Sequence, residues 1–197
     1  MFSAMDVKTL CLGVLSRGAA SGYEIKKQCE EGPFAHFYAA GFGSIYPALN
    51  SLLNDRLISL EEVNQTGRPA KKMYSITSAG RQFLTDEMLQ EPAPDRLRSD
   101  FLFIMFFGQM LPARDIDALI EGRIALYRGR LTEMYQCQNE PMPEGEKFAL
   151  GYGITVYEAG VEYLENHRHE LVGAALRNES GGEDVPPSAS ELSEVRL

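Results

Sequence analysis

The chain has 197 residues, of which 44% are hydrophobic and 24% are charged, and its formal net charge is −9 at neutral pH. This is the composition of a soluble globular protein, and the longest apolar run, residues 101–107, is too short for a membrane span of about 20 residues. Residues 1–90 contain nine basic and nine acidic side chains, so the whole negative excess lies in the second half and does not exclude DNA binding by the first.

Three helices are predicted near the start of the chain. The first begins behind Asp6, a plausible N-cap, where apolar residues recur at helical spacing. The second opens with Ser21 and Glu24, which have the spacing of a capping box. The third begins at Ser44 and carries Pro47 in its first turn, where a missing N–H group is harmless.

A β-hairpin and a fourth helix are predicted next. Two strand-like runs, residues 57–63 and 71–76, flank a polar loop that contains glycine and proline. Thr77 is placed to cap a helix that extends to about residue 89. The order helix, helix, helix, hairpin, helix predicts a winged helix-turn-helix over residues 1–90, a DNA-binding domain.

The second half is predicted to be helical. Behind a Glu-Pro-Ala-Pro linker, the sequence predicts helices over residues 95–107, 112–138 and 146–176. We expect residues 95–176 to form a dimerisation and effector domain, and residues 177–197, rich in Ser, Gly, Glu and Pro, to form a disordered tail. The expected fold is therefore mainly α with a small β-hairpin wing, followed by a C-terminal helical dimerisation domain.

The third helix is the expected recognition helix. In a helix-turn-helix, the second helix of the motif enters the major groove with its N-terminal residues nearest the base edges. We therefore expect Ser44, Tyr46, Pro47 and Asn50 to face DNA, because serine and asparagine can bond base edges or phosphates. Taken alone, this polar stripe favours a solvated helix face over a DNA contact.

The hairpin tip carries a cluster of positive charge. Arg68, Lys71 and Lys72 lie within five residues, next to Gly67 and Pro69. A wing with such a cluster can reach the minor groove or the flanking phosphates, although lysines at a hairpin tip can also serve solubility alone. Their combination with the polar recognition helix favours DNA contact.

Three segments resemble the PadR family of transcriptional regulators, in the expected order and spacing. They are Gly22-Tyr-Glu-Ile25, Gly43-Ser-Ile-Tyr-Pro-Ala-Leu49 and Gly67-Arg-Pro-Ala-Lys-Lys-Met-Tyr-Ser-Ile-Thr-Ser-Ala-Gly80. The resemblance implies a homodimeric repressor on a palindromic operator, released by a small aromatic or lipophilic effector. It also implies that Tyr23 and Lys26 lie near the DNA backbone, with Ser44, Tyr46 and Pro47 in the recognition helix and Gly67, Arg68, Pro69 and Lys71 in the wing.

The apolar side chains of the second half are expected to form core and dimer contacts. The residues that we assign to dimerisation are Phe101, Phe103, Ile104, Phe106, Phe107, Tyr157 and Leu164. Tyr127, Tyr135 and Tyr152 could offer stacking and hydroxyl contacts to an aromatic effector, with ordinary interface tyrosines as the alternative.

Two other functions remain open on the same scaffold. A redox or metal sensor would use Cys11, Cys29 and Cys137, or His167 and His169, but the cysteine spacing matches no zinc or redox motif and favours a reduced, cytoplasmic protein. Histidines two residues apart do not share a helix face. A winged-helix module that binds only proteins is the other alternative. The sequence has no paired-carboxylate or nucleophile-base pattern and no phosphate-binding loop, so we expect neither an enzyme nor a cofactor.

Overall fold

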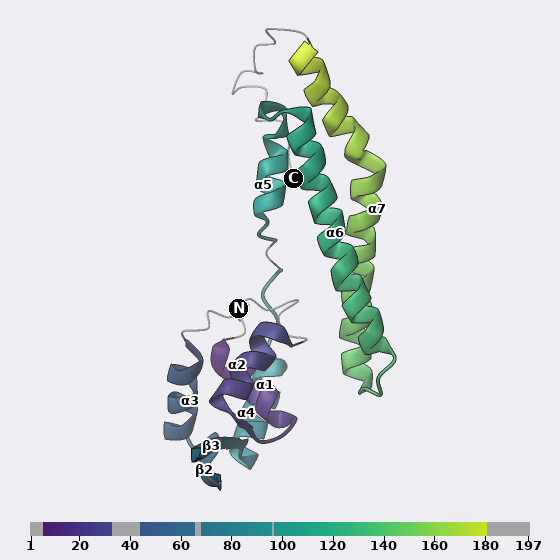
Figure 1. Cartoon of the computed structure of the whole chain (residues 1–197). Coiled ribbons are helices and arrows are strands. Elements are labelled where there is room, and N and C mark those ends of the chain that lie inside the picture. The colour runs from purple at the N-terminus through teal and green to yellow at the C-terminus, as the bar shows by residue number, and fades with distance from the viewer. Residues whose placement is uncertain (1–5, 33–43, 66–67, 96, 181–197) are drawn as a thin grey trace. The chain divides into compact units, whose positions relative to one another are not determined.

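The computed structural model describes residues 6–32, 44–65, 68–95 and 97–180 (Figure 1). The chain divides into two compact units, Met1–Arg96 and Leu97–Leu197, and each has a hydrophobic core of its own. Within the described ranges, none of the helices combines the length and the apolar character that a membrane crossing requires.

The first three helices of the first unit begin where the sequence predicts. They are α1 (Val7–Ser16), α2 (Gly22–Glu31) and α3 (Ile45–Asn54). The Asp6 carboxylate caps α1, and Ser21 and Glu24 form both hydrogen bonds of the capping box at α2. Helix α3 starts directly after Ser44, which leaves Pro47 in its first turn.

A three-stranded antiparallel sheet completes the winged helix. Its strands, in the spatial order β1-β3-β2, are β1 (Ala20–Ser21), β2 (Ile58–Gln65) and β3 (Arg68–Ile76), and α4 (Ser78–Met88) follows behind the cap residue Thr77. The hairpin strands are longer than predicted, because ladder pairing continues to Gln65 opposite Arg68, past a register shift after Val63. Backbone pairing needs no apolar alternation, so polar residues expected to be loop are strand. No pattern in the sequence predicted the two-residue β1.

Helix α1 lies at the centre of the first core. Its residues Cys11 and Leu12 are fully buried, and α3, α4 and β3 all pack against it. Gly80, in the first turn of α4, lies so close to the residue before β2 that a Cβ atom there would stand 2.1 Å from the Leu57 carbonyl oxygen. The other fully buried leucine and isoleucine side chains of this unit are Leu15, Ile25, Ile45, Leu49 and Leu52.

The second unit is built from helices. They are α5 (Asp100–Phe106), a 3-10 turn (Gly108–Met110), α6 (Ala113–Gln138) and α7 (Glu144–Ser180). The long helices α6 and α7 lie side by side in opposite directions, with α5 along α6 (Figure 1). Helix α5 is shorter than the predicted 95–107, because Ser99 caps it by accepting a 3.1 Å bond from the Leu102 N–H.

The predicted disordered tail is wrong at its start. Residues 177–180 are the last turn of α7, and residues 181–197 lie outside the described part of the chain. A tertiary contact explains the difference, since the Glu179 carboxylate accepts a 2.8 Å bond from the N–H of Ala113 at the start of α6. Composition alone could not reveal that this polar segment has a partner 66 residues away.

Polar contacts join α6 and α7 around an apolar seam. Arg168 of α7 donates two bonds to Asp117, at 2.5 and 2.6 Å, and a third to Glu121, at 2.7 Å. The bonds from Arg168 hold the pKa of Asp117 below its ordinary value. The buried core beneath them includes Ile116, Ile120, Ile124, Leu131, Met134, Ile154 and Val161.

Candidate nucleic-acid interface

Helix α3 separates an apolar face from a polar one. Its core face holds Ile45, Ala48, Leu49 and Leu52, all buried. Tyr46, Pro47 and Asn50 are exposed on the other side, and Ser44 is half-buried just before the first turn. The N-terminal part of α3 therefore presents the predicted recognition residues to solvent, where a DNA groove could receive them.

Tyr46 rests on the start of α2. A Cβ atom built on Gly22 would lie 2.7 Å from the Cε1 atom of the Tyr46 ring, closer than real Cβ contacts come. Tyr46 is 53% exposed as a residue, so its contact with Gly22 leaves much of it accessible. A residue larger than glycine at position 22 would have to displace the Tyr46 ring.

Helix α2 contributes two further predicted contacts. Tyr23 is 69% exposed at the start of the helix. Lys26 is half-buried and forms an ion pair with Glu30, one helical turn later, at 3.3 Å. Such a pair on a solvated helix face is weak, so Lys26 can still turn toward a phosphate.

The wing divides its lysines between two settings. Lys71 donates a 2.8 Å hydrogen bond to the carboxylate of Glu24 on α2, whereas Lys72, opposite Glu62 in the strand register, is exposed. The backbones of Arg68 and Pro69 open β3, and the predicted wing residue Gly67 lies outside the described residues. Of the two lysines, Lys72 is the one that a phosphate can reach without breaking the Glu24 pair.

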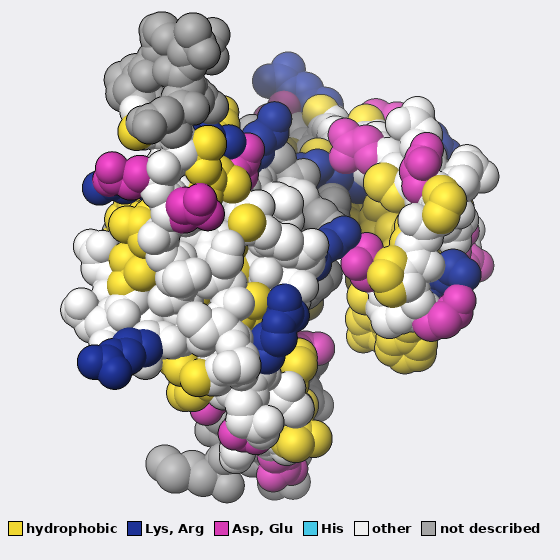
Figure 2. All heavy atoms as spheres, turned by 90° about the horizontal axis from the view of Figure 1, so that it is seen from below, with side chains coloured by type: hydrophobic (Ala, Val, Ile, Leu, Met, Phe, Trp, Pro, Cys, Tyr) yellow, Lys and Arg dark blue, Asp and Glu magenta, His cyan; other side chains and the backbone are white. Residues whose placement is uncertain are grey.

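Glu24 is strongly stabilised in its charged form. The Lys71 ammonium, the Ser21 backbone N–H and the Ser21 hydroxyl together lower the pKa of this carboxyl from 4.5 to about 2. On the face shown in Figure 2, the Lys and Arg side chains stand as separate groups with uncharged side chains between them. The positive charge on this face therefore comes from a few separate cations and not from a continuous basic surface.

The predicted recognition helix and the wing both contact the first turn of α2. Tyr46 of α3 contacts Gly22 there, and Lys71 of β3 bonds to Glu24. Sequence reasoning identified Glu24 as a capping residue and Gly22 as part of a motif, but it missed both of these contacts. Local spacing predicts a cap, whereas a pair 47 residues apart in the chain leaves no periodic signal.

The residues assigned to dimerisation fall into two groups. Phe101 is buried beneath the Arg123 guanidinium, 4.6 Å from its ring centroid, and Tyr157 and Leu164 pack on the core of their own unit. By contrast, Phe103, Ile104, Phe106 and Phe107 are exposed on α5 and its C-cap. The first group stabilises the chain's own fold, and the second lies outside that core and is open to solvent.

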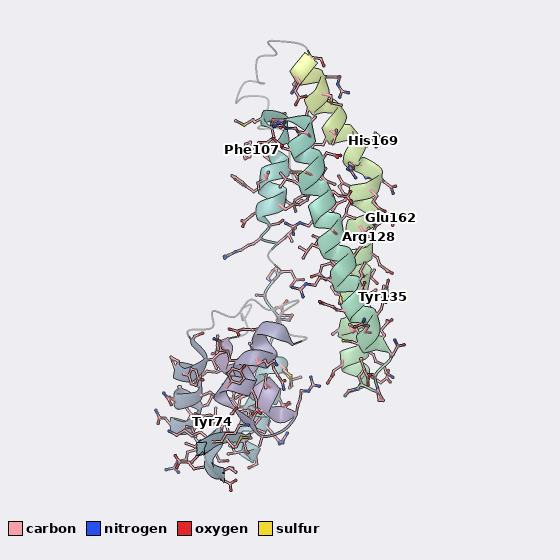
Figure 3. All side chains as sticks on the ribbon, viewed as in Figure 1. Tyr74, Phe107, Arg128, Tyr135, Glu162 and His169 are labelled. Atoms are coloured by element: carbon pink, nitrogen blue, oxygen red, sulfur yellow. The ribbon has the colours of Figure 1, made fainter. Side chains whose placement is uncertain are left out.

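The three predicted effector tyrosines lie in different settings. Tyr127 packs edge-on against Tyr157, with its ring against Gly160. Tyr135 donates its hydroxyl hydrogen to Glu158, and Tyr152 is exposed. Figure 3 shows Tyr135 far along α6 from Phe107, so this tyrosine and the α5 aromatic residues lie at opposite ends of the unit.

Two of the three cysteines of the sensor alternative are poorly placed for it. Cys11 and Cys29 are buried, and burial, with smaller effects from Cys29 and Asp6, raises the pKa of the Cys11 thiol to about 12. Since the thiolate is the reactive form, this thiol is inert in the folded state. Among the residues that the structure describes, no three His, Cys, Asp or Glu side chains are grouped to hold a metal ion.

Comparison with known proteins agrees with this geometry. The model of the "Transcriptional regulator PadR-like family" matches residues 11–86. The negative transcriptional regulator PadR of Bacillus subtilis (strain 168) is 26% identical over 145 residues, which cover 73% of this chain and 79% of that protein.

Two solved structures are similar over nearly their whole length. The PadR-like transcriptional regulator BC1756 from Bacillus cereus superimposes with a TM-score of 0.72 at 34% identity, over 86% of this chain and 97% of that one. The protein smu.1604c from Streptococcus mutans UA159 gives a TM-score of 0.70 at 31% identity, over 83% and 98%. With the matched segments spanning the capped α2, the recognition helix and the wing, the chain belongs to the PadR-like family of transcriptional regulators.

Proposed function

We propose that this regulator is a small-molecule-responsive repressor that binds a palindromic operator as a homodimer. In each copy, α3 enters the major groove of one half-site and the wing contacts the flanking backbone. The observation that carries the proposal is the exposed N-terminal face of α3, with Tyr46, Pro47 and Asn50 presented away from the core and the exposed Lys72 on the neighbouring wing.

The relative from Bacillus subtilis supports the operator binding in this proposal. Bacillus subtilis PadR is described as a negative transcriptional regulator, and it has been solved in complex with operator DNA and in complex with p-coumaric acid. We extend operator binding from that protein to this one because 145 residues align between them. A small aromatic or lipophilic molecule is the corresponding effector class for this chain.

The second unit supports the homodimer. Phe103 and Phe106 each lie about 5 Å, centroid to centroid, from Phe107, which makes one contiguous aromatic surface on α5. A surface of this kind suits an isologous contact with a second copy. An effector would weaken operator binding only to the extent that it favours a dimer with a different spacing of its two α3 helices.

The test begins with genomic fragments selected on the purified full chain. Affinity for the recovered operator and for a random duplex of equal length is then measured by fluorescence anisotropy over a range of salt concentrations. We expect the operator to bind at least about a thousandfold more tightly. The plot of log affinity against log salt concentration has a negative slope. Lys72→Ala should make this slope shallower by about 0.9, because one phosphate contact is lost.

A matched charge control separates this contact from bulk charge. Lys147→Ala removes an exposed lysine of α7 that pairs with Glu144 in the second unit, and it should leave the slope unchanged. Equal, salt-sensitive binding to both duplexes would contradict the proposal and favour a protein-binding module. The same assay, repeated with added phenolic acids, tests the effector class.

A further inference from the structure

The turn that begins α2 is a junction of three elements. Ser21 ends β1, where its Cα pairs with Met73 of β3, and it is also the N-cap of α2. The Glu24 carboxylate accepts bonds from the Ser21 N–H and hydroxyl, both at 2.8 Å. These bonds fix the position of the carboxylate before any other group approaches it.

Lys71 is the partner of this prearranged carboxylate. Its ammonium lies 2.8 Å from Oε1 of Glu24, whereas the bonds to Ser21 use Oε2. One acidic side chain thus satisfies the start of α2 with one oxygen and holds the wing strand β3 with the other. The pair is partly exposed, at 35% for Lys71 and 45% for Glu24, so it contributes little to stability and its loss should leave the domain folded.

The same turn also supports the recognition helix, through the contact of Gly22 with the Tyr46 ring. Gly22 and Glu24 are two residues apart. The recognition helix α3 and the wing strand β3, both expected to touch DNA, therefore contact the same turn of α2. A DNA duplex has a fixed distance between its major groove and its backbone. A domain that already holds the recognition helix and the wing at that distance loses less conformational entropy on binding.

We propose that Glu24 is a positioning residue for DNA recognition, which anchors the wing through Lys71 to the turn on which Tyr46 rests. In this arrangement Lys71 is an anchor and not a phosphate contact. The inference rests on the proposed operator binding, and it assigns the two wing lysines opposite roles, with Lys72 free to meet phosphate.

The test uses conservative variants of the full chain in the salt-dependence assay. Lys71→Gln should weaken operator binding about two- to fivefold, the range of a partly exposed ion pair, with an unchanged salt slope. Glu24→Gln keeps a capping-box acceptor but releases Lys71. It should therefore strengthen random-duplex binding, steepen that slope by up to about 0.9 and lower the ratio of operator to random affinity.

Two further variants complete the design. Glu61→Gln removes an exposed carboxylate of β2 that lies opposite Met73, and it should not change the operator-to-random ratio beyond a uniform effect of charge. The double variant Glu24→Gln/Lys71→Gln should match Lys71→Gln alone. A shallower slope for Lys71→Gln, by about 0.9, would show that Lys71 contacts phosphate and would overturn the proposal, as would an unchanged ratio for Glu24→Gln.

A readout without DNA separates this inference from the function on which it rests. The carboxyl titration of Glu24, followed by NMR, should show a pKa of about 2 in the parent chain and a higher one in Lys71→Gln. If that shift appears while no variant or parent binds duplex selectively, the ion pair stands and the proposed function fails. If the parent binds its operator but Glu24 titrates identically with and without Lys71, the anchor fails by itself.

Discussion

The two units differ in how completely each one buries its apolar side chains. In the first unit, α1, α2, α3 and the sheet enclose a core whose members include five fully buried leucine and isoleucine residues besides Leu12. In the second unit, α6 and α7 share a narrow seam, and large side chains remain exposed along α5 and α7. Among the described residues these include Leu102, Phe103, Phe106, Phe148, Tyr152, Val156 and Tyr163.

This difference indicates different requirements for assembly. A soluble monomer rarely exposes a contiguous apolar patch of aromatic residues, and obligate dimer interfaces resemble a domain core divided in two. The first unit has the closed core of a domain that presents a few polar residues to its target. The second has a half-open core, which is what the proposed homodimer requires.

The largest expected effect breaks the closed core of the first unit. Leu52 is fully buried on α3, so Leu52→Ala should lower the free energy of unfolding of this unit by about 2–5 kcal/mol through lost burial and a residual cavity. Hydrogen exchange measured by mass spectrometry should show faster exchange in α1 and α3. The amides of α6 and α7 should keep their protection.

A surface variant serves as the control for Leu52→Ala, and the exchange of α6 and α7 tests whether the two units unfold independently. Leu89→Ala, at a leucine that is 78% exposed, should change stability by no more than about 0.5 kcal/mol. An equal loss of protection in α6 and α7 on Leu52→Ala would mean that the two units unfold together, and the comparison between them would not hold.

The next effect addresses the open surface of the second unit. Phe106 is 65% exposed on α5, and Phe106→Glu places a charge in the aromatic surface proposed for the dimer. We expect the dissociation constant of the dimer to rise by at least about thirtyfold, which corresponds to the loss of 2 kcal/mol typical of an interface hot spot. Sedimentation equilibrium measures it, and circular dichroism should show that the helices persist.

Thr132→Glu supplies a matched control for Phe106→Glu. Thr132 is exposed on α6 and bonds within its own helix to the Arg128 carbonyl, so the same added charge there should leave the oligomeric state unchanged. A parent chain that sediments as a monomer, or a Phe106→Glu variant that still dimerises as tightly, would remove α5 from the interface.

Local signals explain how much of the fold could be predicted. Asp6, Ser21 and Thr77 each cap a helix within three residues of themselves, and such short-range chemistry is written directly in the sequence. The hairpin was recognised from its turn residues, but its ends were not, because polar strand residues near the tip lack the period of two that marks a half-buried strand.

Long-range contacts explain what the sequence could not show. The bond that Glu179 accepts from the Ala113 N–H holds the end of α7 in a segment of tail-like composition, and Lys71 pairs with a glutamate 47 residues away. For the candidate site, the polar face of α3 was predictable from helical spacing. The separation of Lys71 from Lys72 was not, since the two are neighbours in the chain with identical chemistry and only the folded α2 distinguishes them.

The smallest expected effect is a difference in cysteine labelling between the two units, because each unit contains at least one cysteine. Cys11 and Cys29 lie in the closed core of the first unit, and Cys137 is exposed near the end of α6. With iodoacetamide at pH 8, intact mass should show rapid addition of one label at Cys137. Cys11, whose pKa burial raises to about 12, should react only when the core opens, and denaturant should allow three labels.

Rapid labelling of Cys11 in the folded chain would show that this core is not closed, and it would reopen the possibility of a thiol sensor in the DNA-binding unit. Slow labelling of both Cys11 and Cys29 would mean that any response to oxidant must begin at Cys137, in the unit proposed to form the dimer.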